Sequence, residues 1–302
     1  MQSNGITIEY HERGEGDPLL LVMGLGGQLT DWPEGFVDAL VARGFRVISF
    51  DNRDSGLSTE VQGEPPTRPE LAKAIILRRQ LNAYYKIPDM AADAIGLLDA
   101  LEIDEAHVVG MSMGGMIAQQ IAIDFPDRVR SLTSIMSTTG NPRVGRPKMR
   151  LIRKAMRRTE PTLDNAIEMS IETFRDVCGP TFDADQFRVL AEKSIARSFR
   201  PNGTSRQLAA IIASPDRTEA LERLKEDQAP LADLAERLGY QSEAAFSRAF
   251  KRIIGVSPGA ARQTRDHTVR APGLTTVSAP PRRLQSARSA TAGSVRAART
   301  AG

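Results

Sequence analysis

Apolar positions in the first half of the chain alternate between short runs and helical stripes. Five short runs have the apolar or alternating character of strands: 6–10, 19–23, 45–50, 106–109 and 131–137. Residues 32–42 and 90–101 place apolar side chains at helical spacing, whereas residues 59–88 are polar and proline-containing, as in a connection. Strands that alternate with helices predict an α/β fold with a mostly parallel sheet.

A glycine-rich turn is the most specific feature of this half. The β-branched pair Val108-Val109 leads into Gly110-Met111-Ser112-Met113-Gly114, and residues 116–122 have the character of a helix. Strand, turn and helix place Ser112 at the tip of a sharp turn, where small neighbours permit a strained backbone. This G-x-S-x-G arrangement is the one that exposes a nucleophilic serine.

On the strength of this turn and its flanking elements, residues 5–224 resemble the α/β-hydrolase family, most closely its esterase and methylesterase branch. The resemblance implies that Ser112 is the catalytic nucleophile. It also implies that the backbone N–H groups of Leu25 and Met113 form an oxyanion hole. Leu25 lies in the glycine-rich loop 24–27, which follows the second run of strand character.

A further segment, Asp51 to Ser58, follows the third run of strand character. It resembles the D-x-R-x-x-G-x-S segment of the same family, which braces the ends of the strands. Charged pairs in loops are more often structural than catalytic. We therefore interpret Asp51 and Arg53 as structural residues.

Residues 140–220 change in character: they are helical, basic at first, and then rich in Met, Ile and Phe. The resemblance places a helical cap over the active site here. A cap lined with such residues would suit a small apolar ester or other apolar ligand. The residues concerned are Met149, Met156, Met169 and Phe174. The alternative, which we favour, is that these side chains are the cap's own packing.

The residues that should activate the serine are not recognisable. In the family the catalytic residues occur in the order serine, acid, histidine. Downstream of Ser112 the chain has one histidine, His267, inside an arginine-rich tail; His11 and His107 lie on predicted strands, His107 at the end away from Ser112. A serine hydroxyl needs a base within hydrogen-bond reach, and losing a member of the triad costs roughly three to six powers of ten in rate. We therefore expect impaired catalysis, and enzymatic activity stays an open question.

A second motif occupies the place where the family would have its catalytic acid and histidine. Residues 231–238 carry leucines on one helical face and end at Gly239, and Ser242 can cap a following helix. Residues 234–258 resemble the second helix-turn-helix of the AraC/XylS transcription regulators. The resemblance places a recognition helix in the major groove of DNA. The outward residues that would contact DNA are Glu243, Ala244, Ser247, Arg248, Lys251 and Arg252. One unit, where that family has two, predicts weak DNA binding by the chain alone.

The chain is therefore expected to have three parts. Residues 1–224 form a truncated α/β-hydrolase domain, 225–262 a small all-α helix-turn-helix, and 263–302 a disordered basic tail. The tail holds seven arginines and one aspartate, a charge of +6, so the rest of the chain carries −3 of the total +3. Such a tail can attract nucleic acid, although a solvated disordered end is the simpler interpretation. A junction near residue 224 indicates either a recombined or a misassembled reading frame.

Composition excludes several classes of protein. The hydrophobic fraction of 41% and the charged fraction of 25% are typical of a globular protein in water. A single cysteine, Cys178, excludes an internal disulfide and favours a cytoplasmic location. We expect no signal peptide, no membrane partner, no cofactor and no metal site. The strand near Leu132 to Met136 is expected to form an open sheet edge, which predicts poor solubility.

Two classes of function remain. We favour a sequence-specific, AraC-type DNA-binding regulator whose hydrolase domain is catalytically silent and senses a ligand. The alternative is a serine ester hydrolase that uses Ser112 as its nucleophile. The helix-turn-helix motif is locally complete and the catalytic site is not, and this difference decides our preference.

Overall fold

The computed structural model describes residues 1–77, 81–144, 148–157, 159–180, 182–226 and 247. The chain divides into two compact units, residues 1–228 and 229–302. All elements given below belong to the first unit, so they describe the hydrolase-like part of the chain.

Five strands of the described residues form one mixed sheet in the order β3-β5-β4-β6-β7. Their bounds are β3 Tyr10–Arg13, β4 Asp17–Val22, β5 Phe45–Phe50, β6 Ala106–Met111 and β7 Val129–Ile135. Strand β3 is antiparallel to β5, and the other neighbours are parallel. The predicted α/β class with a mostly parallel sheet is therefore confirmed. The first run splits into β2 (Ile6–Thr7), which pairs with β1 (Gln2–Ser3), and β3.

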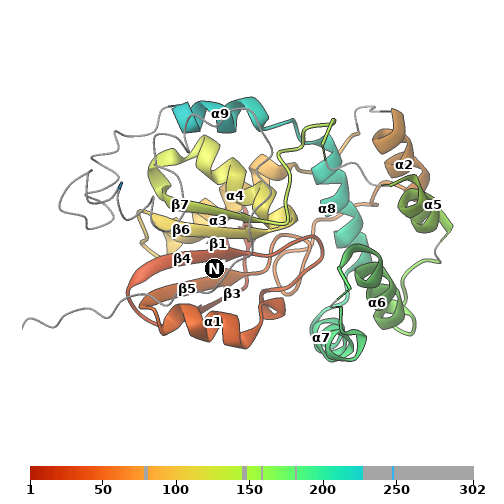
Figure 1. Ribbon diagram of the computed structural model, residues 1–302, viewed down its shortest axis with the longest axis horizontal. Coiled ribbons are helices and arrows are strands. Elements are labelled where there is room, and N and C mark those ends of the chain that lie inside the picture. Colours follow the sequence, from red (N-terminus) through yellow and green to blue (C-terminus); the bar gives the residue numbers. More distant parts are fainter. Residues whose placement is uncertain (78–80, 145–147, 158, 181, 227–246, 248–302) are drawn as a thin grey trace, which may run out of the picture. The chain divides into compact units, whose positions relative to one another are not determined.

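Helices cover both faces of the sheet (Figure 1). Helix α1 (Glu34–Val41) lies on one face, and α3 (Ile87–Ala100) and α4 (Met113–Asp124) lie on the other. Short 3₁₀ turns, η1 (Leu29–Asp31) and η2 (Pro126–Arg128), precede α1 and β7. Alternate strand residues face opposite sides, which explains two separate cores. Leu20 and Val108 pack in the core on the α3 and α4 side, whereas Leu19 and Val109 pack with Val37 of α1.

The predicted helical cap is present in the region where the resemblance placed it. It contains α5 (Met149–Arg157), α6 (Ala166–Val177), α7 (Ala184–Arg197) and α8 (Pro201–Ala213). Helix α2 (Arg68–Leu77) packs against α5 and α8, so the polar stretch 59–88 holds a helix that we did not predict. Helix α9 (Thr218–Glu226) packs against α4. Within the described part of the chain, no helix combines the length and the apolar character needed to cross a membrane.

Buried ion pairs join the cap to the loop after β5. Arg206 of α8 donates two hydrogen bonds to Asp54, at 2.8 and 2.9 Å, and the two side chains are 3% and 0% exposed. The Tyr85 hydroxyl donates to the same carboxylate at 2.6 Å. Arg197 of α7 donates to the buried Asp51 at 2.8 Å. Because a buried carboxylate is costly unless paired, these contacts make the cap and the strand ends depend on each other.

Strand β7 forms one edge of the sheet in the described residues. Residues 131–134 are all exposed, although the neighbouring strand β6 is largely buried. Met136, just after the strand, has a positive φ of 48° and is 78% exposed. The open edge is therefore present where the sequence placed it, and the poor solubility inferred from it stays a prediction.

Candidate functional site

Ser112 lies at the tip of the turn between β6 and α4, in a strained conformation. Its φ and ψ are 55° and −117°, a region that residues with a Cβ atom rarely adopt. Its N–H donates to the carbonyl of Ile135 at 2.8 Å, and its carbonyl accepts from the Gly115 N–H at 3.0 Å and the Ser137 hydroxyl at 2.8 Å. Backbone contacts on both sides therefore hold the serine in this position.

The glycines of the motif are required by close backbone contacts. A Cβ atom on Gly110 would lie 2.1 Å from the carbonyl oxygen of Gly114. A Cβ atom on Gly114 would lie 2.0 Å from the carbonyl oxygen of Val22 in β4. Any side chain at either position would force the strand and the helix apart, which is the physical reason for the G-x-S-x-G spacing.

The loop that contains Leu25 passes beside Ser112. A Cβ atom on Gly24 would lie 3.2 Å from the Cβ of Ser112. The Gly26 N–H donates to the Gln207 side chain at 2.8 Å, and the Gln207 amide donates to the Arg53 carbonyl at 2.7 Å. Helix α8 thus fixes this loop through one buried glutamine. Met113, the other predicted oxyanion donor, is the first residue of α4; the oxyanion role of both residues stays a prediction.

No described histidine reaches Ser112. His11 lies on β3, which β5 and β4 separate from β6. His107 lies five residues before Ser112 along β6, a span of roughly 16 Å, and its Nδ1 hydrogen-bonds the Ser131 hydroxyl at 2.7 Å. Burial lowers the pKa of His107, and nearby Arg130 acts in the same direction. Within the described residues the Ser112 hydroxyl has no hydrogen-bond partner, and residues 136–141 after β7 contain no carboxylate. His267 lies outside the described residues.

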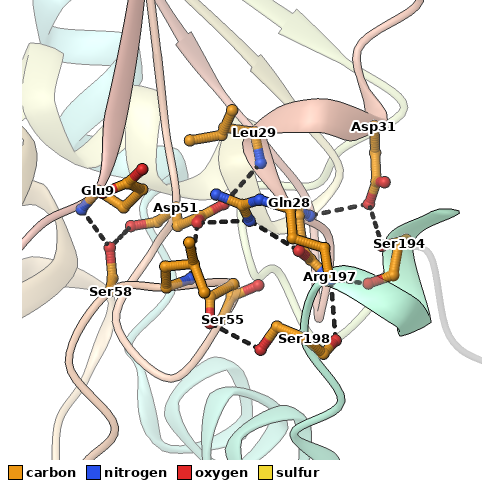
Figure 2. A network of polar contacts seen from close by, with 12 residues as sticks. Glu9, Gln28, Leu29, Asp31, Asp51, Ser55, Ser58, Ser194, Arg197 and Ser198 are labelled. Carbon is orange, nitrogen blue, oxygen red and sulfur yellow. Dashed lines mark hydrogen bonds and ion pairs between the residues drawn. The ribbon is translucent and has the colours of Figure 1, made fainter.

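Asp51 is the centre of a polar network under the cap (Figure 2). Its carboxylate accepts from the N–H groups of Leu29 at 2.7 Å and Leu57 at 2.8 Å, besides the guanidinium of Arg197. The Ser58 hydroxyl donates to the Asp51 carbonyl. Arg53 instead forms a buried pair with Asp93 on α3, at 2.5 and 2.6 Å. These contacts support our interpretation of Asp51 and Arg53 as structural, although they do not pair with each other.

Asp31 belongs to the same network and is partly buried. Its carboxylate accepts from the Gln28 N–H at 2.8 Å and lies 3.5 Å from the Ser194 hydroxyl of α7 (Figure 2). Burial raises the pKa of Asp31, and the nearby negative charge of Asp51 raises it further, whereas Arg197 opposes the shift. Nothing in the local sequence pattern around Gln28 or Arg197 predicted this network.

Two grooves lie on the cap. One, of about 410 Å³, lies between α2 and α5 and is lined by Met149 and Met156 among other apolar residues. Another, of about 440 Å³, is lined by the basic side chains of α5. Neither has Ser112 in its lining. Phe174 packs on Phe187 with ring centres 4.3 Å apart, which supports cap packing as its role. In the described part of the chain, no group of acidic, histidine or cysteine residues could hold a metal ion.

The sheet, the strained serine between strand and helix, and the cap agree with the comparison with known families. Residues 17–194, more than half of the chain, match the family described as the alpha/beta hydrolase fold. This chain belongs to the α/β-hydrolase family. The expectation from the elbow motif is therefore confirmed at the level of the family.

Curated relatives within the family include enzymes of different chemistry. The rhodomycin D methylesterase DnrP of Streptomyces peucetius is 32% identical in an alignment 206 residues long, and the match covers 60% of this chain and 63% of that protein. The 2-hydroxymuconate semialdehyde hydrolase of Pseudomonas sp. (strain CF600) is 34% identical over 137 residues, 45% of this chain and 41% of that protein. The match thus spans less than two thirds of the length of these relatives.

Solved structures show the same fold. Est816, described as an N-acyl homoserine lactone degrading enzyme, is 25% identical with a TM-score of 0.51, over 76% of this chain and 78% of that one. A hydrolase from Pseudomonas aeruginosa PA01 is 20% identical with a TM-score of 0.50, over 76% of both chains. The second likeness concerns the fold alone.

Residues 207–264 match a helix-turn-helix domain, which confirms the second predicted motif and supports DNA binding. The match begins inside α8, so residues 207–226 are part of it and also part of the first compact unit. Among the predicted DNA contacts, Ser247 is described and is helical. The others lie outside the described residues: Glu243, Ala244, Arg248, Lys251 and Arg252.

Replacing Ser112 by glycine should stabilise the fold. Glycine removes the Cβ atom from a residue with a φ of 55°, and relief of such strain outweighs the added entropy of the unfolded chain. We expect the free energy of unfolding of Ser112→Gly to exceed that of Ser112→Ala by about 1 kcal/mol, measured by urea unfolding. Both variants lack the hydroxyl, so equal stabilities would mean that the turn is not strained.

Asp31 should make the fold less stable as the pH rises above 4. Because its pKa in the folded state is raised, the folded protein binds this proton more tightly than the unfolded chain does. Stability is therefore lost as the pH rises from the ordinary aspartate pKa, about 3.9, through the raised value. Asp31→Asn removes this loss, so its unfolding free energy should gain on that of the native protein as the pH rises above about 4. Parallel pH profiles of the two proteins would contradict the assignment.

Proposed function

We propose that this protein is a cytoplasmic, AraC-type, sequence-specific DNA-binding regulator whose α/β-hydrolase domain is catalytically impaired. One observation carries the proposal: a serine elbow without a hydrogen-bonding base in the described residues occurs in the same chain as a helix-turn-helix match. The single cysteine and the DNA partner support the cytoplasmic location.

The chemistry of serine supports impaired catalysis. Without a base, the hydroxyl of Ser112 is a weak nucleophile, and an oxyanion hole alone gives only a residual rate. The elbow and the loop beside it are nevertheless held by contacts of the fold itself, through Gly110, Gly114 and Gln207. The geometry of the site can therefore persist without turnover.

The proposed DNA contacts follow the resemblance to the AraC/XylS regulators. Arg248 would reach a guanine edge or a phosphate, and Ser247 would make adaptable contacts with bases. Lys251 and Arg252 would contact phosphates, which adds affinity without sequence information. Glu243 and Ala244 would face the groove from the start of the recognition helix. One such unit neutralises few phosphates, so binding by one chain is weak.

The hydrolase domain would serve as a ligand sensor. Helix α4 begins directly after Ser112. Helix α9, which leads into the predicted helix-turn-helix, packs against α4. The Arg217 N–H donates to the Thr139 carbonyl at 2.8 Å, and the Thr218 and Thr139 hydroxyls share a hydrogen bond of 2.6 Å. A ligand near Ser112 would thus affect the packing of the segment that leads to the helix-turn-helix. The methylesterase relative supports a small apolar methyl ester as the ligand class.

The alternative function is that of a serine ester hydrolase. The strained conformation of Ser112 favours it, because an exposed serine on such a turn is the form that the chemistry needs. It requires a base from elsewhere, for which His267 is the remaining histidine of the chain.

An ester assay separates the two functions. We expect the full chain and Ser112→Ala to hydrolyse p-nitrophenyl acetate at equal rates near background, because no base activates the hydroxyl. Turnover that disappears in Ser112→Ala would support the hydrolase, and loss of the same turnover in His267→Ala would identify the base.

DNA binding tests the favoured function directly. Fragments selected from a random library by the full chain should lose at least about tenfold in affinity with Arg248→Ala, since one base contact is worth about 1–3 kcal/mol. Affinity for unselected DNA should change far less. The double variant Arg282→Ala/Arg283→Ala, in the tail, is the control and should weaken binding to both kinds of DNA alike. Selected binding that survives deletion of residues 225–262 would overturn the proposal and assign affinity to the tail.

A further inference from the structure

The outer edge of β7 is an open edge of the sheet. In the described residues β7 pairs with β6 on one side only. Four consecutive residues, 131–134, are exposed, and Leu132 in their middle is 36% exposed. An inner strand of a parallel sheet is normally buried on both faces, so this exposure marks a strand that lacks a neighbour.

The direction of the backbone groups on this edge follows from one hydrogen bond. The Ile135 carbonyl accepts from the Ser112 N–H, which lies on the β6 side. The N–H and C=O of a strand residue point to one side, and successive residues alternate. Thr133 and Ile135 therefore face β6, whereas Leu132 and Ser134 direct their N–H and C=O groups outward. Each copy of the chain thus offers two donors and two acceptors in a regular row.

The edge is regular from Ser131 to Ile135, and the one register shift against β6 lies before this stretch, at Arg130. It contains no proline and no lysine, and its single charged side chain is Arg130. That guanidinium is already paired with Asp17 at 2.9 Å and Glu105 at 3.1 Å. Proteins usually protect free edges with charge, proline or a bulge. Two copies of this edge would meet without repulsion between like charges, and each would satisfy the hydrogen bonds of the other.

We propose that β7 is the interface of a symmetric dimer, in which the β7 strands of two copies pair antiparallel about a two-fold axis at Leu132. Antiparallel pairing about this axis places Leu132 opposite Leu132 of the second copy, where the two residues exchange both backbone hydrogen bonds. Ser131 then lies opposite Thr133 of the other copy, within the regular part of the edge. The two leucine side chains cover each other, which removes apolar surface from water.

The dimer supplies what one chain lacks for reading DNA. Each chain contributes one helix-turn-helix unit, so a two-fold dimer presents two, and its DNA site would consist of two half-sites related by the same symmetry. This consequence depends on the proposed function, whereas the pairing of β7 does not.

Sedimentation velocity of the full chain without DNA, from about 1 to 50 µM, tests the interface. The native protein should show a reversible monomer–dimer equilibrium. Leu132→Pro removes the outward N–H and places the proline ring at the open edge, so it should raise the dissociation constant at least about tenfold and leave the β6 pairing intact. Leu132→Ala keeps the N–H group and is the matched control, which should still dimerise.

A second variant guards against simple misfolding. Leu132→Asp places two carboxylates opposite each other on the axis and should also give monomers, with circular dichroism and melting as in the native protein. A native chain that stays monomeric over the whole range would overturn the proposal, as would dimers of equal strength in Leu132→Pro. Open-ended, polydisperse association would also overturn it, as would dimers that form only after removal of residues 227–302. Failure to bind DNA would leave this result unchanged.

Discussion

Two buried carboxylates at the end of β5 impose the strongest constraint on this structure. Asp51 and Asp54 lie where the sheet meets the cap, and both are fully buried. Each is neutralised by an arginine from a cap helix, Arg197 or Arg206. Removing one partner of such a pair leaves a buried charge that costs about 3–5 kcal/mol. The cap is thus a structural part of the domain, and α8 also fixes the loop beside the serine through Gln207.

The elbow illustrates how a catalytic geometry can be independent of catalysis. The strained backbone of Ser112 is maintained by hydrogen bonds to Ile135 and Ser137 and by the close contact of Gly114 with β4. None of these contacts involves an acid or a base. Strain that is enforced by the surrounding fold does not depend on a catalytic acid or base, so the turn by itself indicates the family and does not report activity.

Local patterns in the sequence predicted the elements that local physics determines. The strand at 45–50 and the serine turn follow from apolar runs and glycine spacing, and both lie where they were predicted. Helix α2 was not predicted, because residues 59–88 were interpreted as a polar connection although the stretch Leu71 to Leu77 is mostly apolar. The partners of the buried carboxylates were also beyond prediction: Arg206 lies 152 residues from Asp54, and in sequence it resembles any surface arginine. Tertiary charge pairing leaves no periodic signal.

The contacts between the cap and the strand ends also determine how far the chain of this domain must extend. The hydrolase match ends at residue 194, yet Arg197, Arg206 and Gln207 lie beyond it and hold the strand ends together. A chain divided at residue 194 would lose the arginine partners of Asp51 and Asp54, and the loop beside Ser112 would lose its contact with Gln207. The smallest fragment that keeps these contacts therefore extends through α8 to Ala213. The C-terminal boundary of the domain is therefore set by its salt bridges and not by the end of the sequence match.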